Sequence, residues 1–286
     1  MIEPLRQGLF KECGEPAYGN QDVGITPGGA MDLFSMRCGL ALLGDSQWRA
    51  RAWEIIITPA LRFTVDSYFV LTGARHEGVA LKKPGDAAPP TAVEHGVVTC
   101  APAGSELSFG TRQYGFRTYL CVLPAADADP AIEGRERGTF DKLASWIDPD
   151  NKIRVMKGPE YRFLDNPGRF PDTPWKTTHD LSDMGMRLAP LIGDKLPRVT
   201  MGSMISGAVS NGTVQLTPKG PIILLRYRQT VGGYPRIFNV ISADVDLLGQ
   251  YGPDQVVRFK TVSLEEARGI AKRKKRDLEI LQNRYR

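Results

Sequence analysis

Short apolar segments rich in β-branched and aromatic residues recur along most of this chain, and glycine, proline, asparagine or aspartate bounds each of them. They occupy residues 53–57, 61–65, 68–72, 96–100, 106–109, 116–123, 153–156, 212–216, 221–226, 239–242 and 255–259. Short strands at this spacing are typical of an all-β barrel or sandwich. A content of 30 Gly and 21 Pro agrees, because both residues favour turns. We therefore expect a mainly β chain with a few short helices.

The length of the chain and one polar segment predict two lobes. At 286 residues the chain exceeds the usual size of a single domain. Residues 125–151 are poor in large apolar side chains, so we interpret them as the region that links two sheets. We expect an N-terminal β lobe over residues 1–128 and a C-terminal β lobe over residues 129–286.

Asp32 stands directly before an apolar pattern of helical spacing that runs to Gly44. Aspartate is a good helix N-cap, and glycine is a suitable terminator. A carboxylate at this position could equally serve as a proton-transfer group. Both roles of Asp32 stay open.

The stretch from Gly220 to Pro235 runs a buried strand into a polar turn, Arg228-Gln-Thr-Val-Gly-Gly-Tyr-Pro235. Gly232 and Gly233 allow positive φ angles and close approach of the backbone to a ligand. A guanidinium, an amide and open N–H groups suit a planar ligand that is anionic or carries an amide. The structural alternative is a tight hairpin in which an arginine pairs with a nearby carboxylate.

Most of the net charge of +5 lies in the last 24 residues, where eight Lys/Arg face four Asp/Glu. Ser263-Leu-Glu-Glu266 has the spacing of a capping box, which predicts a C-terminal helix through the basic run 272–276. This helix is either a solvated terminal helix or a docking element for an acidic partner protein. We predict no nucleic-acid binding, because aromatic residues do not alternate with basic ones elsewhere.

Several classes of protein are not indicated by the sequence. No apolar run reaches the ~20 residues that span a bilayer, and the N-terminus lacks an apolar signal core, so a cytoplasmic protein without membrane contact is expected. The four cysteines are scattered and the three histidines lack metal spacing, so neither a disulfide framework nor a metal site is predicted. Neither a Walker A sequence nor a biotinylation motif is present.

The chain resembles the family of the 5-oxoprolinase C subunit, also called biotin-dependent carboxyltransferase or allophanate hydrolase subunit 2, which includes the sporulation regulator KipA. The resemblance is most specific in the last third, where the element Arg228-Gln-Thr-Val-Gly-Gly-Tyr-Pro235 follows the family pattern. Further segments that fit are Gly29-Ala-Met-Asp32, Leu71-Thr-Gly-Ala74, Arg154-Val-Met-Lys-Gly-Pro-Glu160, Met184-Gly-Met-Arg-Leu188, Gly212-Thr-Val-Gln215, Val240-Ile-Ser-Ala-Asp244 and Leu247-Leu-Gly-Gln250.

The sequence also departs from the family pattern at polar positions. The family carries Gln-Asp-Leu-Gly-Arg ahead of its Gly-Ala-Met-Asp motif, whereas this chain has Cys13-Gly-Glu-Pro-Ala17. Before Met184 the family has Asp-Arg, whereas this chain has Ser182-Asp183. An unchanged active site therefore does not follow from family membership.

The resemblance implies two cyclophilin-like β-barrel lobes and a role in a complex with a homologue of the KipI-like B subunit, and the A subunit is a further partner. Such complexes open 5-oxoproline with ATP or carboxylate a small amide. ATP is then expected at the level of the complex, and biotin only on a partner. On this basis we assign Asp32, Arg228 and Gln229 as catalytic candidates. The substrate-binding candidates are Gly29, Gln215, Thr230, Gly232, Gly233 and Tyr234. The alternative is a catalytically silent binding or regulatory partner of a KipI-like B subunit.

Overall fold

The computed structural model describes residues 1–44, 49–135, 143–148, 152–193, 196–202 and 204–285. Its residues group into two compact units. Unit one comprises residues 1–14, 32–147 and 275–286, and unit two comprises residues 15–31 and 148–274. The expected lobe boundary at residues 128 and 129 falls inside unit one, and each unit draws on separate parts of the chain.

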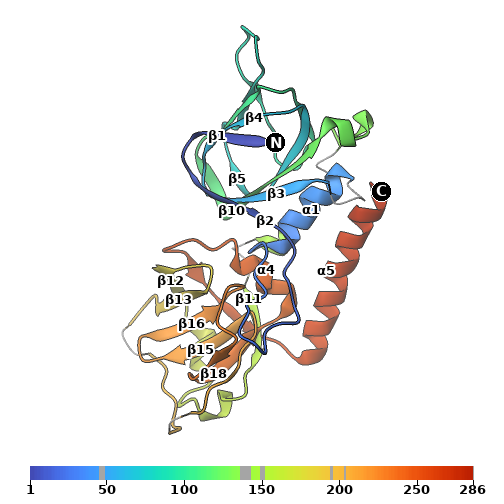
Figure 1. Cartoon of the computed structure of the whole chain (residues 1–286). Coiled ribbons are helices and arrows are strands. Elements are labelled where there is room, and N and C mark those ends of the chain that lie inside the picture. The colour runs from blue at the N-terminus through green and yellow to red at the C-terminus, as the bar shows by residue number, and fades with distance from the viewer. Residues whose placement is uncertain (45–48, 136–142, 149–151, 194–195, 203, 286) are drawn as a thin grey trace. The chain divides into compact units, whose positions relative to one another are not determined.

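The described part of unit one contains two five-stranded sheets, ordered β1-β4-β9-β6-β7 and β2-β3-β10-β5-β8 (Figure 1). All of the strand pairs within these sheets are antiparallel. The strands are β1 Ile2–Arg6, β2 Leu9–Cys13, β3 Arg51–Ile57, β4 Ala60–Phe63, β5 Ser67–His76, β6 Ala80–Lys82, β7 Thr91–Ala92, β8 Thr99–Ala101, β9 Glu106–Ser108 and β10 Arg112–Pro124. Short 3₁₀ helices follow at η1 Ala125–Asp127, η2 Pro130–Ile132 and η3 Ser145–Ile147.

Helix α1 (Leu33–Leu43) packs against β5 and β10 of unit one. Asp32 is its N-cap, and Gly44 ends it in the left-handed conformation at φ 66°, where glycine carries no steric penalty. The helix approaches β10 so closely that a Cβ at Gly39 would lie 2.6 Å from the sulfur of Cys121. The sequence pattern around Asp32 thus predicted this helix and both of its ends.

The described part of unit two is built on an eight-stranded sheet, ordered β19-β12-β13-β16-β15-β18-β11-β20 (Figure 1). Its pairs are antiparallel except the β11–β20 pair, which is parallel. These strands are β11 Ile153–Lys157, β12 Trp175–Leu181, β13 Gly185–Pro190, β15 Thr213–Thr217, β16 Gly220–Leu224, β18 Arg236–Val240, β19 Val256–Val257 and β20 Phe259–Thr261. A separate two-stranded ribbon pairs β14 Gly207–Ala208 with β17 Val231–Gly232, and the short helices are η4 Tyr161–Phe163, α3 Arg169–Asp172, η5 Ser242–Asp244 and α4 Val245–Leu248.

Each unit has its own apolar core. In unit one the core lies between strands and includes Phe63 and Phe69, whose ring centroids are 5.0 Å apart. In unit two Phe170 packs on both Trp175 and Phe238, with ring centroids 4.9 Å apart in each pair. The mainly β fold with a few short helices and a C-terminal helix is therefore confirmed.

The C-terminal helix α5 (Leu264–Arg284) begins at the predicted capping box. The Ser263 N–H donates to Glu266 Oε2 at 2.8 Å, and the Glu266 N–H donates to Ser263 Oγ at 3.1 Å. Within the basic run, residues 272, 273, 275 and 276 are all exposed. Lys274, by contrast, is buried and belongs to unit two. The run is therefore a solvated helix face interrupted by one internal cation.

Candidate functional site

The polar turn between β16 and β18 belongs to unit two, and Arg226 fixes its start. The Arg226 side chain donates to Asp246 Oδ1 at 2.7 Å and to the carbonyl of Met31 at 3.1 Å. Asp246 also accepts from Lys274 Nζ at 2.7 Å. The hairpin arginine that pairs with a carboxylate is thus Arg226 and not Arg228.

Arg228 is buried, with 5% of its surface exposed, and forms no ion pair with any described residue. Its Nη2 donates to the carbonyl of Val209 at 3.0 Å, whereas its Nε and Nη1 are buried without a hydrogen-bond partner among the described residues. Burial lowers the pKa of Arg228, although the phenol of Tyr18 counteracts this. Two guanidinium donors in this turn are consequently available to an acceptor from outside the chain.

The other predicted residues of the turn lie close to the two-stranded ribbon. Gln229 and Thr230 are both half-buried, and the carbonyl of Thr230 accepts from the N–H of Val209 at 3.1 Å. The side-chain amide of Gln215 is buried on β15 and donates to the carbonyl of Tyr234 at 3.2 Å. Gln215 therefore holds the second half of the turn in place.

The expected positive φ angles at Gly232 and Gly233 are wrong, because neither residue adopts one. Close approach explains the first glycine instead: a Cβ at Gly232 would lie 2.5 Å from Nε2 of Gln215. A Cβ at Gly233 would lie 3.2 Å from Oγ of Ser206. Positive φ occurs earlier in unit two, at Gly28 (59°) and Gly29 (85°), where the chain passes the ring of Tyr227.

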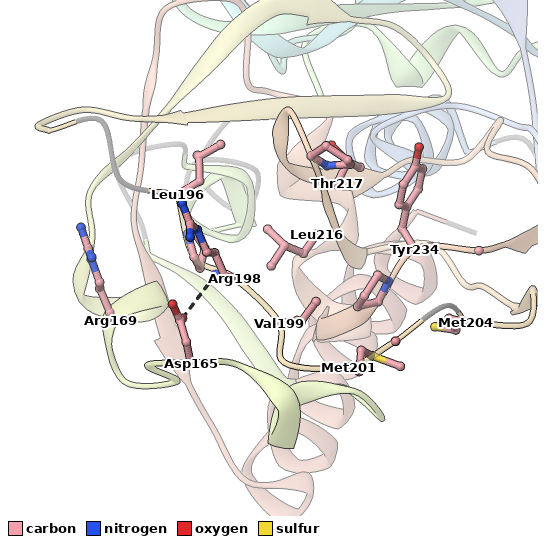
Figure 2. A pocket seen from close by; sticks show the side chains of 15 residues that line it. Asp165, Arg169, Leu196, Arg198, Val199, Met201, Met204, Leu216, Thr217 and Tyr234 are labelled. Atoms are coloured by element: carbon pink, nitrogen blue, oxygen red, sulfur yellow. Dashed lines mark hydrogen bonds between the residues drawn. The ribbon is translucent and has the colours of Figure 1, made fainter.

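A cavity of about 910 Å³ opens in unit two, and the end of the polar turn forms one of its walls (Figure 2). Gly233 and Tyr234 line it from the predicted set, whereas Arg228, Gln229 and Thr230 do not. The opposite side carries Arg169 and Arg198, which the sequence patterns did not single out. Their only sequence signal is that they are basic residues outside the C-terminal run.

Asp32 lies in unit one, whereas the polar turn lies in unit two. The Asp32 carboxylate is fully buried and caps α1: Oδ1 accepts from the Ser35 N–H at 2.9 Å, and Oδ2 lies 2.5 Å from the Ser35 hydroxyl. The backbone N–H of Asp32 donates to the Tyr119 hydroxyl at 2.7 Å, which in turn donates to Glu54 Oε2 at 2.7 Å. The capping role of Asp32 is therefore observed directly.

Glu54 and Tyr119 form a buried polar cluster that the sequence reasoning did not identify. Arg117 Nε lies 3.4 Å from Glu54 Oε1, and Lys11 Nζ lies 3.9 Å from the same atom. Burial raises the pKa of Tyr119 well above its usual value, and the charges of Glu54 and Asp32 add to this effect. The Tyr119 hydroxyl is thus kept protonated as a hydrogen-bond donor to Glu54.

The described residues contain no group of three or more His, Cys, Asp or Glu side chains arranged to hold a metal ion. Among the described helices, none combines the length and the apolar character required to cross a bilayer.

Comparison with known proteins identifies the family. The model of the carboxyltransferase domain, subdomain A and B, matches residues 23–146 and 127–261. The C subunit of 5-oxoprolinase from Escherichia coli (strain K12) is 30% identical over 300 residues, which cover 93% of each chain. The protein of the same name from Haemophilus influenzae is 31% identical over 281 residues, which cover 87% of each chain.

Solved structures support the same fold. The crystal structure of Kluyveromyces lactis urea carboxylase aligns with a TM-score of 0.78 at 18% identity, over 98% of this chain but only 29% of that chain. This chain therefore corresponds to a part of that larger protein, and the low identity supports the fold alone. The sequence resemblance is confirmed: the chain belongs to the carboxyltransferase domain family, subdomain A and B, and is a relative of the 5-oxoprolinase C subunit.

Proposed function

We propose that this chain is one component of an ATP-dependent 5-oxoprolinase-like amide (lactam) hydrolase or of a carboxyltransferase. It acts on a planar amide substrate together with a homologue of the KipI-like B subunit, and with the A subunit where the reaction requires it. The near full-length similarity to two proteins named as the C subunit of 5-oxoprolinase supports membership of a multi-subunit enzyme. ATP is used at the level of the complex, biotin is carried only by a partner, and the complex is cytoplasmic.

The unsatisfied guanidinium of Arg228 is the observation that carries this proposal. A buried cation without a counter-charge is unfavourable by several kcal/mol. An anionic oxygen of the substrate, or of a phosphorylated intermediate, would satisfy the free Nε and Nη1 donors of Arg228. Gln229 and Thr230 then supply hydrogen bonds to the amide. Asp32, which belongs to unit one, is a separate proposal for a proton-transfer group.

A coupled assay tests the proposal. The chain is purified with its B-subunit and A-subunit homologues, supplied with ATP and 5-oxoproline, urea or other lactams, and ADP release is followed. We expect substrate-stimulated ADP release that requires this chain. Absence of stimulation by every amide tested, from a complex that assembles, contradicts the enzymatic role. An active monomer from native cells contradicts the assembly.

A silent binding or regulatory partner of the B subunit is the second candidate, and the environment of Asp32 favours it. Both carboxylate oxygens of Asp32 are engaged by Ser35, and the group has no exposed surface. Under this alternative the complex assembles, but Asp32→Asn leaves the ADP release of the complex unchanged.

Docking of the basic helix to an acidic partner is part of the proposal and needs its own test. Exchange of Lys272, Arg273, Lys275 and Arg276 for glutamate reverses the solvated charges while the buried Lys274 is kept. Electrostatic docking predicts weaker, less salt-sensitive binding to the B subunit. Unchanged affinity for the B subunit at low salt would show that the basic run is a solvated helix face without a docking role.

A further inference from the structure

The cavity in unit two has two stable walls. On one side the N–H of Asp165 donates to the carbonyl of Arg198 at 3.0 Å, and Leu164 forms a β-bridge with Val199. On the other side the N–H of Leu216 donates to the carbonyl of Pro235 at 2.9 Å. Hydrogen bonds of the backbone thus connect both walls to ordered parts of the unit. The volume of about 910 Å³ lies within the range of small-molecule sites.

The charged groups of the cavity favour an anion. Arg169 and Arg198 line it together with one carboxylate among the described residues, that of Asp165. Oδ1 of Asp165 already accepts from the N–H groups of Asn166 at 2.8 Å and Arg198 at 3.3 Å. Neither guanidinium has an ion pair or a side-chain hydrogen bond with a described residue. Figure 2 shows both arginines on the same side of the cavity.

The remaining lining favours an apolar body. Leu196, Val199, Met201, Met204 and Leu216 contribute apolar side chains. The hydroxyl of Thr217 is already occupied, because it accepts from Arg187 Nη1 at 2.9 Å and donates to the carbonyl of Gly220 at 2.8 Å. A ligand that carried only amide groups would therefore find few polar partners here, whereas a carboxylate would meet two guanidinium groups.

We infer that this cavity binds a small organic acid, with its carboxylate at Arg198 and Arg169 and its apolar body against Val199 and Leu216. Arg198 determines the preference for an acid over the corresponding amide. Binding requires neither ATP nor another protein, so it is measured on the chain alone, and its outcome is separate from that of the coupled assay.

Calorimetric titration of the full chain tests this site with three probes: hexanoate, hexanamide and acetate. Hexanoate combines a carboxylate with an apolar body, hexanamide keeps the body and lacks the charge, and acetate keeps the charge and lacks the body. We expect hexanoate to bind at least about tenfold more tightly than either of the other two, since one charge-assisted contact contributes about that factor.

Three variants locate the binding. Arg198→Gln should weaken hexanoate binding about tenfold and leave hexanamide unchanged. Val199→Trp should weaken hexanoate binding, because the indole takes the place of the apolar body at the wall that Val199 forms. Arg162→Gln is the matched control: Arg162 is exposed and does not line the cavity, so its loss should leave hexanoate binding within about twofold of the wild type. Circular dichroism confirms that each variant is folded.

Each of the following results would overturn the inference: no hexanoate binding, equal affinity for hexanoate and hexanamide, or unchanged binding by a folded Arg198→Gln protein. Equal loss in Arg198→Gln and Arg162→Gln would also overturn it, because it would show a response to net charge and not to this cavity.

Discussion

Replacement of Lys274 by methionine should destabilise unit two strongly, although Lys274 belongs to a run of basic residues on a C-terminal helix. Its Nζ lies 2.7 Å from the carbonyl of Ala243 and 2.7 Å from Asp246 Oδ2. Asp246 also binds Arg226 at 2.7 Å. Methionine keeps the approximate volume of the side chain and removes both contacts.

The expected loss of unfolding free energy follows from the buried carboxylate of Asp246, which loses one of its two cationic partners. Removal of one partner from a buried ion pair costs about 3–5 kcal/mol, because the remaining charge is buried without compensation. Asp246 keeps Arg226, which places the expected loss near the lower limit, about 3 kcal/mol. Since whole domains are stable by only about 5–15 kcal/mol, such a loss is a large fraction of the stability of the unit.

The assay is urea unfolding at pH 7, followed by the fluorescence of Trp175, which is buried in the core of unit two, in a protein whose other three tryptophans are replaced by phenylalanine in wild type and variants alike. Lys275→Met is the matched control. Lys275 is adjacent in sequence, its side chain is 78% exposed, and its contact is Glu279 at 3.6 Å. We expect the control to lose no more than about 0.5 kcal/mol.

The pH dependence gives a second readout. Burial alone would raise the pKa of Asp246, but Lys274 and Arg226 outweigh burial and hold the pKa of Asp246 below its usual value. A carboxylate whose pKa is lowered by folding contributes stability above its unfolded pKa and loses it as the pH falls through the folded pKa. Loss of Lys274 raises the folded pKa of Asp246, so the gap between wild type and Lys274→Met should be constant near neutral pH and shrink as Asp246 becomes protonated first in the folded variant and then in the folded wild type.

Equal midpoints for Lys274→Met and Lys275→Met would refute this reasoning. So would additive losses in a cycle with Asp246→Asn, because groups in direct ionic contact are expected to couple.

Three further substitutions test the candidate site. Arg228→Lys should lower turnover of the complex at least about tenfold, because an ammonium cannot reproduce the guanidinium fork, and activity within a fewfold of wild type would contradict the role. Gly232→Ala should destabilise unit two by about 1–3 kcal/mol in urea unfolding, because its Cβ would lie 2.5 Å from the buried amide of Gln215, and an unchanged midpoint would contradict the close approach. Asp32→Asn should keep the cap on the Ser35 N–H and change stability by less than about 1 kcal/mol, while ADP release falls if the carboxylate transfers a proton.

The sequence predicted those helices and strands that depend on interactions between residues close together in the chain. The N-cap Asp32 and the terminator Gly44 predicted α1, because the hydrogen bonds of a cap involve neighbouring residues. Strand β10 was predicted from its continuous apolar run. It is the central strand of its sheet, and a strand that is buried on both faces needs such a run. By contrast β12, Trp175–Leu181, was not predicted, because its segment is mostly polar and only positions 175 and 177 are buried.

The candidate site was predictable in composition and not in geometry. The glycine pair was expected to adopt positive φ angles, but the packing reason for glycine at position 232 is the side chain of Gln215, which is 17 residues earlier in the chain. No local pattern reports such a contact. The same holds for Arg169 and Arg198, which meet at the cavity only because the β-bridge between Leu164 and Val199 joins two irregular segments.

The burial of Lys274 in α5 could have been predicted from the helical spacing of the apolar residues, but the neighbouring basic residues drew attention to charge instead. The buried apolar positions of α5 are 267, 270, 278 and 281, so steps of three or four residues lead directly through position 274. A lysine on the apolar stripe of a helix requires a buried counter-charge, which Asp246 supplies. Position on the stripe, and not membership of the basic run, determines what Lys274 does. Truncation before Lys272 would therefore remove a stabilising ion pair together with the exposed charges, and could not isolate a docking role.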